Sequence, residues 1–254
     1  MLRGDRKFGN AILLGPTGVG KTETASALSK WLFEGRMIKK DMGEYKHPSD
    51  GRRLFGDQYK MGSLTKEVTE MGSCVVLFDE IEKAHPEVFD TFLTLFDEGK
   101  MGDAATNLRV SFKNTIILMT TNLAPDREED TPLEALGNDK RRDLFAYHFR
   151  TELLGRINRI LVYNELTEGA TEGILRKRVG CILARKEEEG VRIEVAENIY
   201  RHLARQVRSC RYGVRGADEV IINSVGAAIA GIPKGTDTVS LTLEGNGRIA
   251  WHAS

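Results

Sequence analysis

AILLGPTGVGKTETAS, residues 11–26, is the stretch that decides the fold. It begins with the apolar run from Ala11 to Leu14, which is typical of a strand buried on both faces of a parallel sheet. Three glycines follow, and from Thr22 to Phe33 apolar residues recur at the three- and four-residue spacing of an amphipathic helix. A strand, a glycine-rich loop and a helix in this order predict an α/β fold.

The loop itself, GPTGVGKT, fits the pattern G-x-x-x-x-G-K-[ST] of a phosphate-binding loop. Glycines let successive backbone N–H groups point at phosphate oxygens, and the positive end of the following helix dipole adds to the attraction. We expect Lys21 to reach the β- and γ-phosphates and Thr22 to ligate Mg²⁺. The alternative is a glycine-rich turn with an incidental lysine, which the flanking strand and helix disfavour. The residues expected to bind ATP are Gly15, Pro16, Thr17, Gly18, Val19, Gly20, Lys21 and Thr22.

Two acids follow a second apolar run, in CVVLFDEIEKAHPEVF. The strand Val75 to Phe78 would carry Asp79 and Glu80 to the same edge of the sheet as the phosphate-binding loop. There Asp79 would hold Mg²⁺, directly or through water, and Glu80 would polarise the attacking water. The alternative is an ordinary helix-start signal, because acidic residues favour first turns.

Composition limits the class of protein. With 254 residues, 41% of them hydrophobic and 29% charged, the chain suits one large domain or a large and a small one. The 37 basic and 37 acidic residues cancel, so no bulk charge favours nucleic acid or a membrane surface as a partner. Cys74, Cys181 and Cys210 are far apart and favour reduced thiols. No apolar run is long enough for a membrane span, and we expect a cytoplasmic protein.

The texture of the sequence changes after Tyr163. Before it, further strands are predicted at 74–78, 115–119 and 160–163, and a helix at 86–96. After it come a long charged helix, the strand VRIEV and a terminal hairpin in TVSLTLEGNGRIAWH. We therefore expect a large domain over residues 1–165 and a smaller one over 166–254.

Five segments together resemble the AAA+ ATPase module of the Clp/Hsp100 unfoldase family, in particular the second ATPase domain of the ClpB and ClpV types. The similarity extends from Phe8 to Val220. It implies a large domain with a central parallel sheet flanked by helices, a smaller α+β C-terminal lid domain, Mg²⁺-dependent ATP hydrolysis and assembly into a ring, usually a hexamer. The segments are GPTGVGKTETASAL, LFDEIEKAHPEVFDTFLTLFDEGKM, SFKNTIILMTTN, FRTELLGRINRI and YGVRGADEV.

The resemblance assigns three further residues. Asn122 matches the sensor-1 residue that helps to place the water, and its alternative is a turn former at a strand end. Arg156 matches the arginine finger that enters a neighbouring subunit's site, with Arg150 as a second candidate; without the resemblance, a surface salt bridge is the simpler interpretation of either. Arg215 matches sensor 2, which couples the bound nucleotide to the small domain, although Gly216 follows it where the family usually has proline.

The sequence departs from the family pattern in three places. RLFGDQYKMGSLTKEV, residues 53–68, keeps both flanks of the aromatic pore loop but is shorter between them. Tyr59 is the remaining aromatic residue, either a contact for an extended polypeptide or a surface tyrosine. The chain also begins only a few residues before the first strand, where family members have a segment that covers the adenine, so we expect either an excised or truncated fragment or a looser hold on the adenine. Finally, Leu136 and Gly137 precede Asn138 where peptidase-docking relatives carry Ile-Gly-Phe or Ile-Gly-Leu, which favours remodelling over delivery to a ClpP-type peptidase.

Three hypotheses remain. The first is an ATP-driven protein-remodelling ring, which requires hydrolysis that depends on assembly. The second is a nucleotide-controlled assembly module that threads no substrate, which the shortened loop around Tyr59 favours. The third is a nucleic-acid-acting AAA+ protein, which the balanced charge disfavours.

Overall fold

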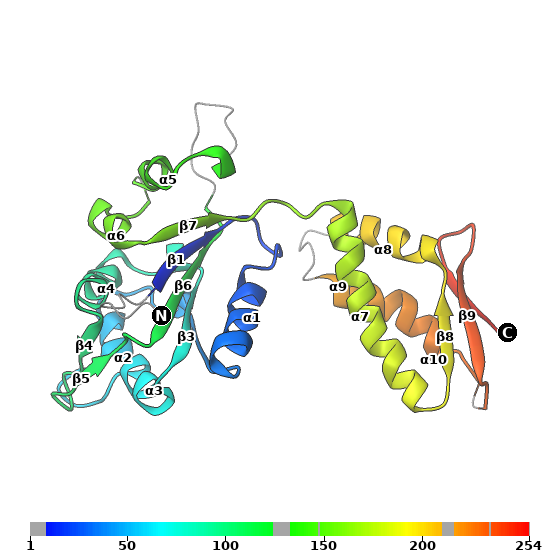
Figure 1. The fold of residues 1–254 in the computed structure, drawn as a ribbon, viewed down its shortest axis with the longest axis horizontal. Helices are drawn as coiled ribbons and strands as arrows, with labels where there is room; N and C mark the ends of the chain where they lie inside the picture. The colour runs from blue at the N-terminus through cyan, green and yellow to red at the C-terminus, as the bar shows by residue number, and fades with distance from the viewer. Residues whose placement is uncertain (1–8, 124–132, 147, 210–215, 234, 254) are drawn as a thin grey trace, which may run out of the picture. The chain divides into compact units, whose positions relative to one another are not determined.

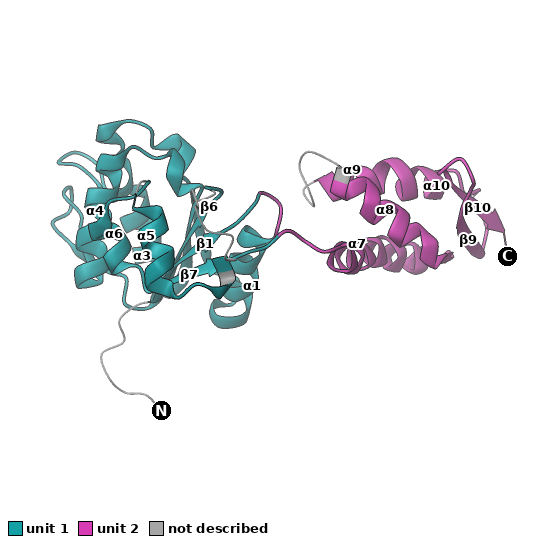
Figure 2. Cartoon of the chain, turned by 90° about the horizontal axis from the view of Figure 1, so that it is seen from above, with its two compact units in different colours: residues 1–16, 20–164 teal, residues 17–19, 165–254 magenta. Residues whose placement is uncertain are grey.

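The computed structural model describes residues 9–123, 133–146, 148–209, 216–233 and 235–253. The chain divides into two compact units, one of residues 1–16 and 20–164 and one of residues 17–19 and 165–254 (Figure 2). Among the helices in the described ranges, none is long and apolar enough to cross a membrane.

A parallel sheet of five strands forms the centre of the first unit (Figure 1). The strand order is β2-β3-β6-β1-β7, so neighbouring strands in the sheet are separated in the sequence and joined by crossovers through helices. Since all five strands run in the same direction, their carboxyl ends meet at one edge. The strands are β1 Gly9–Leu14, β2 Met37–Asp41, β3 Cys74–Asp79, β6 Thr115–Thr121 and β7 Arg159–Val162.

Helices cover both faces of this sheet. The alternation of side chains along β1 shows the division, because Leu13 packs in one hydrophobic cluster with Ala25 of α1, whereas Ile12 and Leu14 pack in the other. Helix α1, Lys21–Phe33, covers the first face. Four helices contribute buried residues to the second cluster along with α4, namely α2 Gly51–Phe55, α3 Ser63–Met71, α5 Asn138–Phe145 and α6 Thr151–Arg156.

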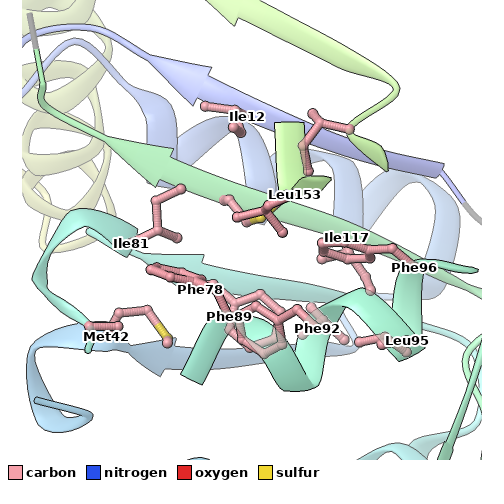
Figure 3. Packing of buried hydrophobic residues seen from close by; sticks show 14 of the residues in the cluster. Ile12, Met42, Phe78, Ile81, Phe89, Phe92, Leu95, Phe96, Ile117 and Leu153 are labelled. Carbon is pink, nitrogen blue, oxygen red and sulfur yellow. The ribbon is translucent and has the colours of Figure 1, made fainter. Parts of the chain in front are cut away.

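The central helix of the second face is α4, Pro86–Glu98. Pro86 occupies its first turn, His85 caps it by accepting a hydrogen bond from the backbone of Glu87, and Gly99 ends it in the left-handed conformation. Phe92 of this helix is fully buried and lies 4.7 Å, centroid to centroid, from Phe78 of β3 (Figure 3). Aromatic packing therefore fixes α4 against the strand that ends in the two acids.

The second unit has its own core. Helices α7, Glu168–Glu188, and α8, Glu197–Ser209, pack against a three-stranded sheet of order β10-β9-β8, in which β9 pairs antiparallel with β10 and parallel with β8. Its remaining elements are β8 Arg192–Val195, α9 Ala217–Ile221, a π-helical turn Ile222–Gly226, α10 Ala227–Ala230, β9 Thr238–Leu243 and β10 Ile249–Ala253.

The predicted elements are present with small shifts of their bounds, and the α/β class is confirmed. The strand of the central sheet that the sequence analysis missed is β2, MIKKD, and the short strands of the hairpin at 100–102 and 109–111 were missed as well. Two of the five residues of β2 are lysines, so its apolar pattern is short, and its position between α1 and α3 at the edge of the sheet is set by pairing with β3. Tertiary pairing overrides a weak local pattern at this strand.

A buried carboxylate joins two loops of the first unit. Asp103 follows β4, Lys100–Gly102, in the hairpin that β5, Arg109–Ser111, completes, and only 1% of its surface is exposed. It accepts hydrogen bonds from the backbone of Gly62 at 2.9 Å, from the hydroxyl of Thr65 at 2.6 Å and from Thr106. Burial would raise the pKa of this carboxyl, but the hydrogen bonds outweigh it and the pKa is lowered.

We expect Asp103→Asn to lower the free energy of unfolding at pH 7 by about 1–3 kcal/mol, because an amide cannot accept all of these hydrogen bonds. The lowered pKa means that the ionised carboxylate stabilises the fold above its unfolded pKa and that this stabilisation is lost as the pH falls through the folded value. The difference in free energy of unfolding between wild type and variant, measured by urea unfolding, should become smaller below about pH 4. Asp139→Asn, at a carboxylate whose side chain is 93% exposed, is the control and should change little; equal losses would contradict the interpretation.

Candidate nucleotide site

The predicted phosphate-binding loop connects β1 to α1, and its glycines adopt backbone conformations that other residues avoid. Gly18 and Gly20 have φ values of 83° and 99°, in the left-handed region. Gly15 has a φ of 152°, and a Cβ at that position would lie 2.3 Å from the carbonyl oxygen of Tyr163. The three glycines therefore permit a tight curl of backbone between strand and helix, as a phosphate cradle requires.

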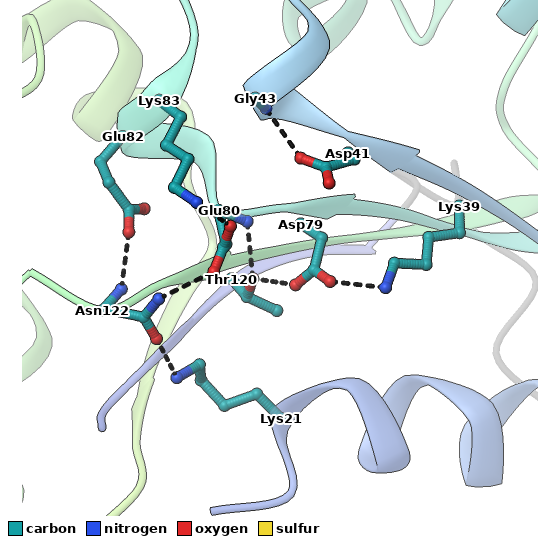
Figure 4. Close-up of polar contacts among 10 residues, drawn as sticks. All are labelled: Lys21, Lys39, Asp41, Gly43, Asp79, Glu80, Glu82, Lys83, Thr120 and Asn122. Atoms are coloured by element: carbon teal, nitrogen blue, oxygen red, sulfur yellow. Dashed lines mark hydrogen bonds and ion pairs between the residues drawn. The ribbon is translucent and has the colours of Figure 1, made fainter. Parts of the chain in front are cut away.

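The ammonium group of Lys21 lies over this curl. It is 7% exposed and donates hydrogen bonds to the carbonyl oxygens of Gly15 at 2.5 Å and Pro16 at 2.7 Å. It also donates to Oδ1 of Asn122 at 2.7 Å (Figure 4). Lys21 opens α1, and Asn122 follows the last residue of β6, so parallel strands bring together residues that are 101 positions apart.

Asp79 ends β3 on the same edge of the sheet. Its side chain is 9% exposed, and both of its oxygens have partners. Oδ1 accepts a hydrogen bond from the hydroxyl of Thr120 at 2.5 Å, and Oδ2 pairs with Nζ of Lys39 at 2.7 Å. A mostly buried carboxylate is thus compensated by one hydroxyl and one cation.

Glu80 has a left-handed backbone, with φ 58° and ψ 57°, which is uncommon for a residue that carries a side chain. Its N–H donates to the hydroxyl of Thr120 at 2.9 Å. Its carboxylate accepts a hydrogen bond from Nδ2 of Asn122 at 3.3 Å and pairs with Nζ of Lys83 at 2.5 Å. The hydrogen bond to Glu80 raises the pKa of Lys83. Contacts with Lys83 and Asn122 hold the carboxylate beside the Asn122 amide.

Asn122 is held from its backbone as well. Its N–H donates to Oε1 of Glu82 at 3.1 Å, while Oε2 of Glu82 is buried and has no hydrogen-bond partner among the described residues. The two ends of the Asn122 amide therefore face Lys21 and Glu80 in a fixed orientation. An amide suits this place, because it accepts from a cation and donates to a carboxylate at once.

The two candidate finger arginines lie away from this cluster, at the two ends of α6, and each pairs with an acid of α4. Arg156, the last residue of α6, pairs through Nε with Asp97 at 2.6 Å, and Arg150 pairs with Asp90 at 2.6 Å. The hydrogen bond between Arg156 and Asp97 lowers the pKa of Asp97 and raises that of Arg156. Within this chain both arginines thus form exposed salt bridges.

Two other predicted residues have different outcomes. Tyr59 is 86% exposed, in a short loop that Asp57 caps by accepting hydrogen bonds from the backbone of Tyr59 and Lys60. These backbone hydrogen bonds lower the pKa of Asp57. Arg215 lies outside the described residues.

The cluster fits a nucleotide with Mg²⁺. Thr22 follows Lys21 in the first turn of α1, and Asp79 ends β3, which is separated from β1 by β6 alone, so hydroxyl and carboxylate oxygens are available at one edge of the sheet. Mg²⁺ prefers oxygen ligands of this kind together with phosphates and waters. The curled backbone and the Lys21 ammonium suit the phosphates themselves.

Four residues of the cluster were not predicted, namely Thr120, Lys39, Lys83 and Glu82. Thr120 stands one position before the end of β6, where a polar residue directly after the apolar run IILM, in the strand next to β3, is a usable signal. Lys83 lies three residues after Glu80, at the spacing of an ion pair on a helical turn. Lys39 gave no signal, because the strand that carries it was itself missed.

The family model described as "AAA domain (Cdc48 subfamily)" matches residues 6–160. Chaperone protein ClpB of Lactiplantibacillus plantarum is 34% identical over 239 residues, which is 89% of this chain and 28% of the relative. The same-named protein of Tropheryma whipplei is 32% identical, over 95% of this chain and 36% of the relative, and that of Agrobacterium fabrum is 37% identical, over 87% and 26%. The chain thus spans roughly a third of the length of these curated relatives.

We expect Thr120→Val to lower the free energy of unfolding by about 1–3 kcal/mol, because it leaves the Glu80 N–H without its acceptor and removes a donor from Asp79. Thr115→Val is the matched control, since Thr115 is a buried threonine at the other end of the same strand and donates to the carbonyl of Phe112. Urea unfolding should show a loss of stability in both variants, whereas binding of a fluorescent ATP analogue should weaken only in Thr120→Val. Equal binding by the two variants would show that Thr120 supports the fold alone.

Proposed function

The chain belongs to the AAA+ family as a Clp/ClpB-like ATPase module, and from this premise we propose that the cluster around Lys21, Glu80 and Asn122 binds and hydrolyses ATP with Mg²⁺. The observation that carries the proposal is the continuous set of contacts from the Lys21 ammonium through the Asn122 amide to the Glu80 carboxylate. Phosphoryl transfer to water needs a phosphate-binding cation and a water-polarising base that are held in a fixed position relative to each other.

Binding uses the backbone first. The N–H groups of the loop from Gly15 to Thr22 would hold the phosphates, and Lys21 would exchange its carbonyl and amide acceptors for phosphate oxygens. Thr22 and Asp79 would hold the magnesium ion, which when bound neutralises charge on the phosphates.

Hydrolysis uses the side chains at the ends of β3 and β6. Glu80 would accept a proton from the attacking water, and Asn122 would orient that water once Lys21 has released its amide oxygen. Lys83 and Asn122 compensate the charge of Glu80 in the present arrangement. The Glu80 base is therefore held ready beside the loop.

The remaining roles depend on assembly and follow from the resemblance. Residues 1–165 would form the large ATP-binding domain and 166–254 the lid domain, whose Arg215 would sense the nucleotide. Arg156 would leave Asp97 and enter the site of a neighbouring copy in a ring, which in this family is usually a hexamer, and Tyr59 would contact a protein substrate in the cytoplasm.

The relatives named above are chaperones, and protein remodelling is the corresponding activity for this chain. An assembly module that threads no substrate is the second candidate, favoured by the short loop that carries Tyr59. Mutation of Tyr59 distinguishes the two, because a remodelling ring should lose substrate processing and keep its ATPase.

We expect the rate of Mg²⁺-dependent ATP hydrolysis per chain to rise with protein concentration as the ring forms. Phosphate release measures the hydrolysis, and light scattering measures the assembly. Glu80→Gln should retain nucleotide binding and lose about a hundredfold or more in rate. Arg156→Ala should bind nucleotide and assemble but hydrolyse slowly.

Arg109→Ala is the control for the loss of an exposed arginine, since Arg109 pairs with Glu98 at the surface, and it should hydrolyse normally. Arg150→Ala tests the second finger candidate, and loss of rate in that variant with normal Arg156→Ala would reverse the assignment. A Glu80→Gln chain that hydrolyses at the wild-type rate would overturn the proposal.

A further inference from the structure

Lys39 takes no part in the function proposed above, yet it contacts one of the site's two acids. Its Nζ lies 2.7 Å from Oδ2 of Asp79, in a pair whose side chains are 45% and 9% exposed (Figure 4). The Lys39 side chain is therefore nearly half exposed, and the Asp79 side chain is mostly buried.

The sheet places Lys39 by register. Strand β2 runs parallel to β3, with Lys39 beside Leu77 and Asp41 beside Asp79. The Lys39 side chain extends past this position toward the carboxyl end of β3, where it meets Asp79. Lys40 points to the other face of the strand and pairs with Glu67 of α3. Of the two adjacent lysines, only Lys39 faces the nucleotide site.

The pair offsets a cost that the fold otherwise carries. Burying a carboxylate such as that of Asp79 has an energetic cost, and the hydroxyl of Thr120 offsets part of it at Oδ1. Lys39 supplies the opposite charge at the other oxygen. The same carboxylate is the one that the proposed function assigns to Mg²⁺.

We propose that Lys39 is a built-in counter-ion that competes with Mg²⁺ for Asp79 and so sets the Mg²⁺ concentration at which nucleotide is held. The inference rests on the proposed nucleotide site. In the ligand-free protein Lys39 neutralises the charge of Asp79. It contacts Oδ2 while Thr120 contacts Oδ1, and the two contacts together hold the carboxylate in one orientation. When Asp79 serves the metal, the ammonium has to withdraw into solvent, which its long and half-exposed side chain permits.

The test is the Mg²⁺ dependence of binding of a fluorescent ATP analogue, measured at fixed analogue concentration as MgCl₂ is titrated. Lys39→Met should lower the half-saturating Mg²⁺ concentration by about fivefold, the size expected for losing a partly exposed ion pair. Lys66→Met, which removes the lysine of an exposed pair with Glu70, is the control for net charge and should leave the midpoint unchanged. An unchanged or raised midpoint in Lys39→Met would overturn the inference.

Two further variants keep the test decisive. In an Asp79→Asn background the substitution of Lys39 should no longer shift the midpoint, and a persisting shift would show that Lys39 acts on the nucleotide and not through Asp79. Lys39→Arg retains the charge and should keep the midpoint within about twofold, so it serves if Lys39→Met does not fold.

Stability of the ligand-free protein gives a readout independent of nucleotide. Without Mg²⁺, Lys39→Met should unfold at lower urea concentration than wild type, because Asp79 loses its counter-ion, and no loss would count against the inference. A wild-type chain that binds no nucleotide would overturn the proposed function and this inference with it. Nucleotide binding with an unshifted Mg²⁺ midpoint would overturn the inference alone.

Discussion

The parallel pairing of β3 and β6 is the constraint on which the site depends. It sets Phe78 beside Met119, so the residues that follow each strand emerge at the same edge. The hydroxyl of Thr120 then bridges Asp79 and the backbone of Glu80, which fixes both acids to the neighbouring strand. A slip of one residue in this pairing would turn every side chain of a strand to the opposite face. The geometry of the site is therefore a property of the sheet and not of a flexible loop.

Charge compensation is the second principle of the site. Lys83, Glu80, Asn122 and Lys21 form an alternating series of cation, anion, amide and cation, and Asp79 has Lys39 as its own partner. Each charged group is satisfied before any ligand arrives, which suits groups that are partly or mostly buried. Loading such a site is an exchange of partners, so its affinity reflects the contacts that are given up as well as those that are gained.

Much of this arrangement could be predicted from the order of residues. The glycine spacing before Lys21 and the apolar run before Asp79 specify a strand and a turn locally, and the structure places both at one sheet edge. Lys39 escaped prediction because its strand is held by pairing and not by its own pattern. The salt bridge between Arg156 and Asp97 could not be predicted either, because a contact between residues 59 positions apart leaves no periodic pattern in the sequence.

The buried carboxylate of Asp103 has a mechanical meaning. Through Gly62 and Thr65 it fastens the base of the loop that displays Tyr59, and through Thr106 it fastens the tip of the β4–β5 hairpin. A force applied at Tyr59 would also act on the hairpin and on α3, because all three are connected through the Asp103 carboxylate. A pull on Tyr59 would therefore displace the loop and the β4–β5 hairpin together.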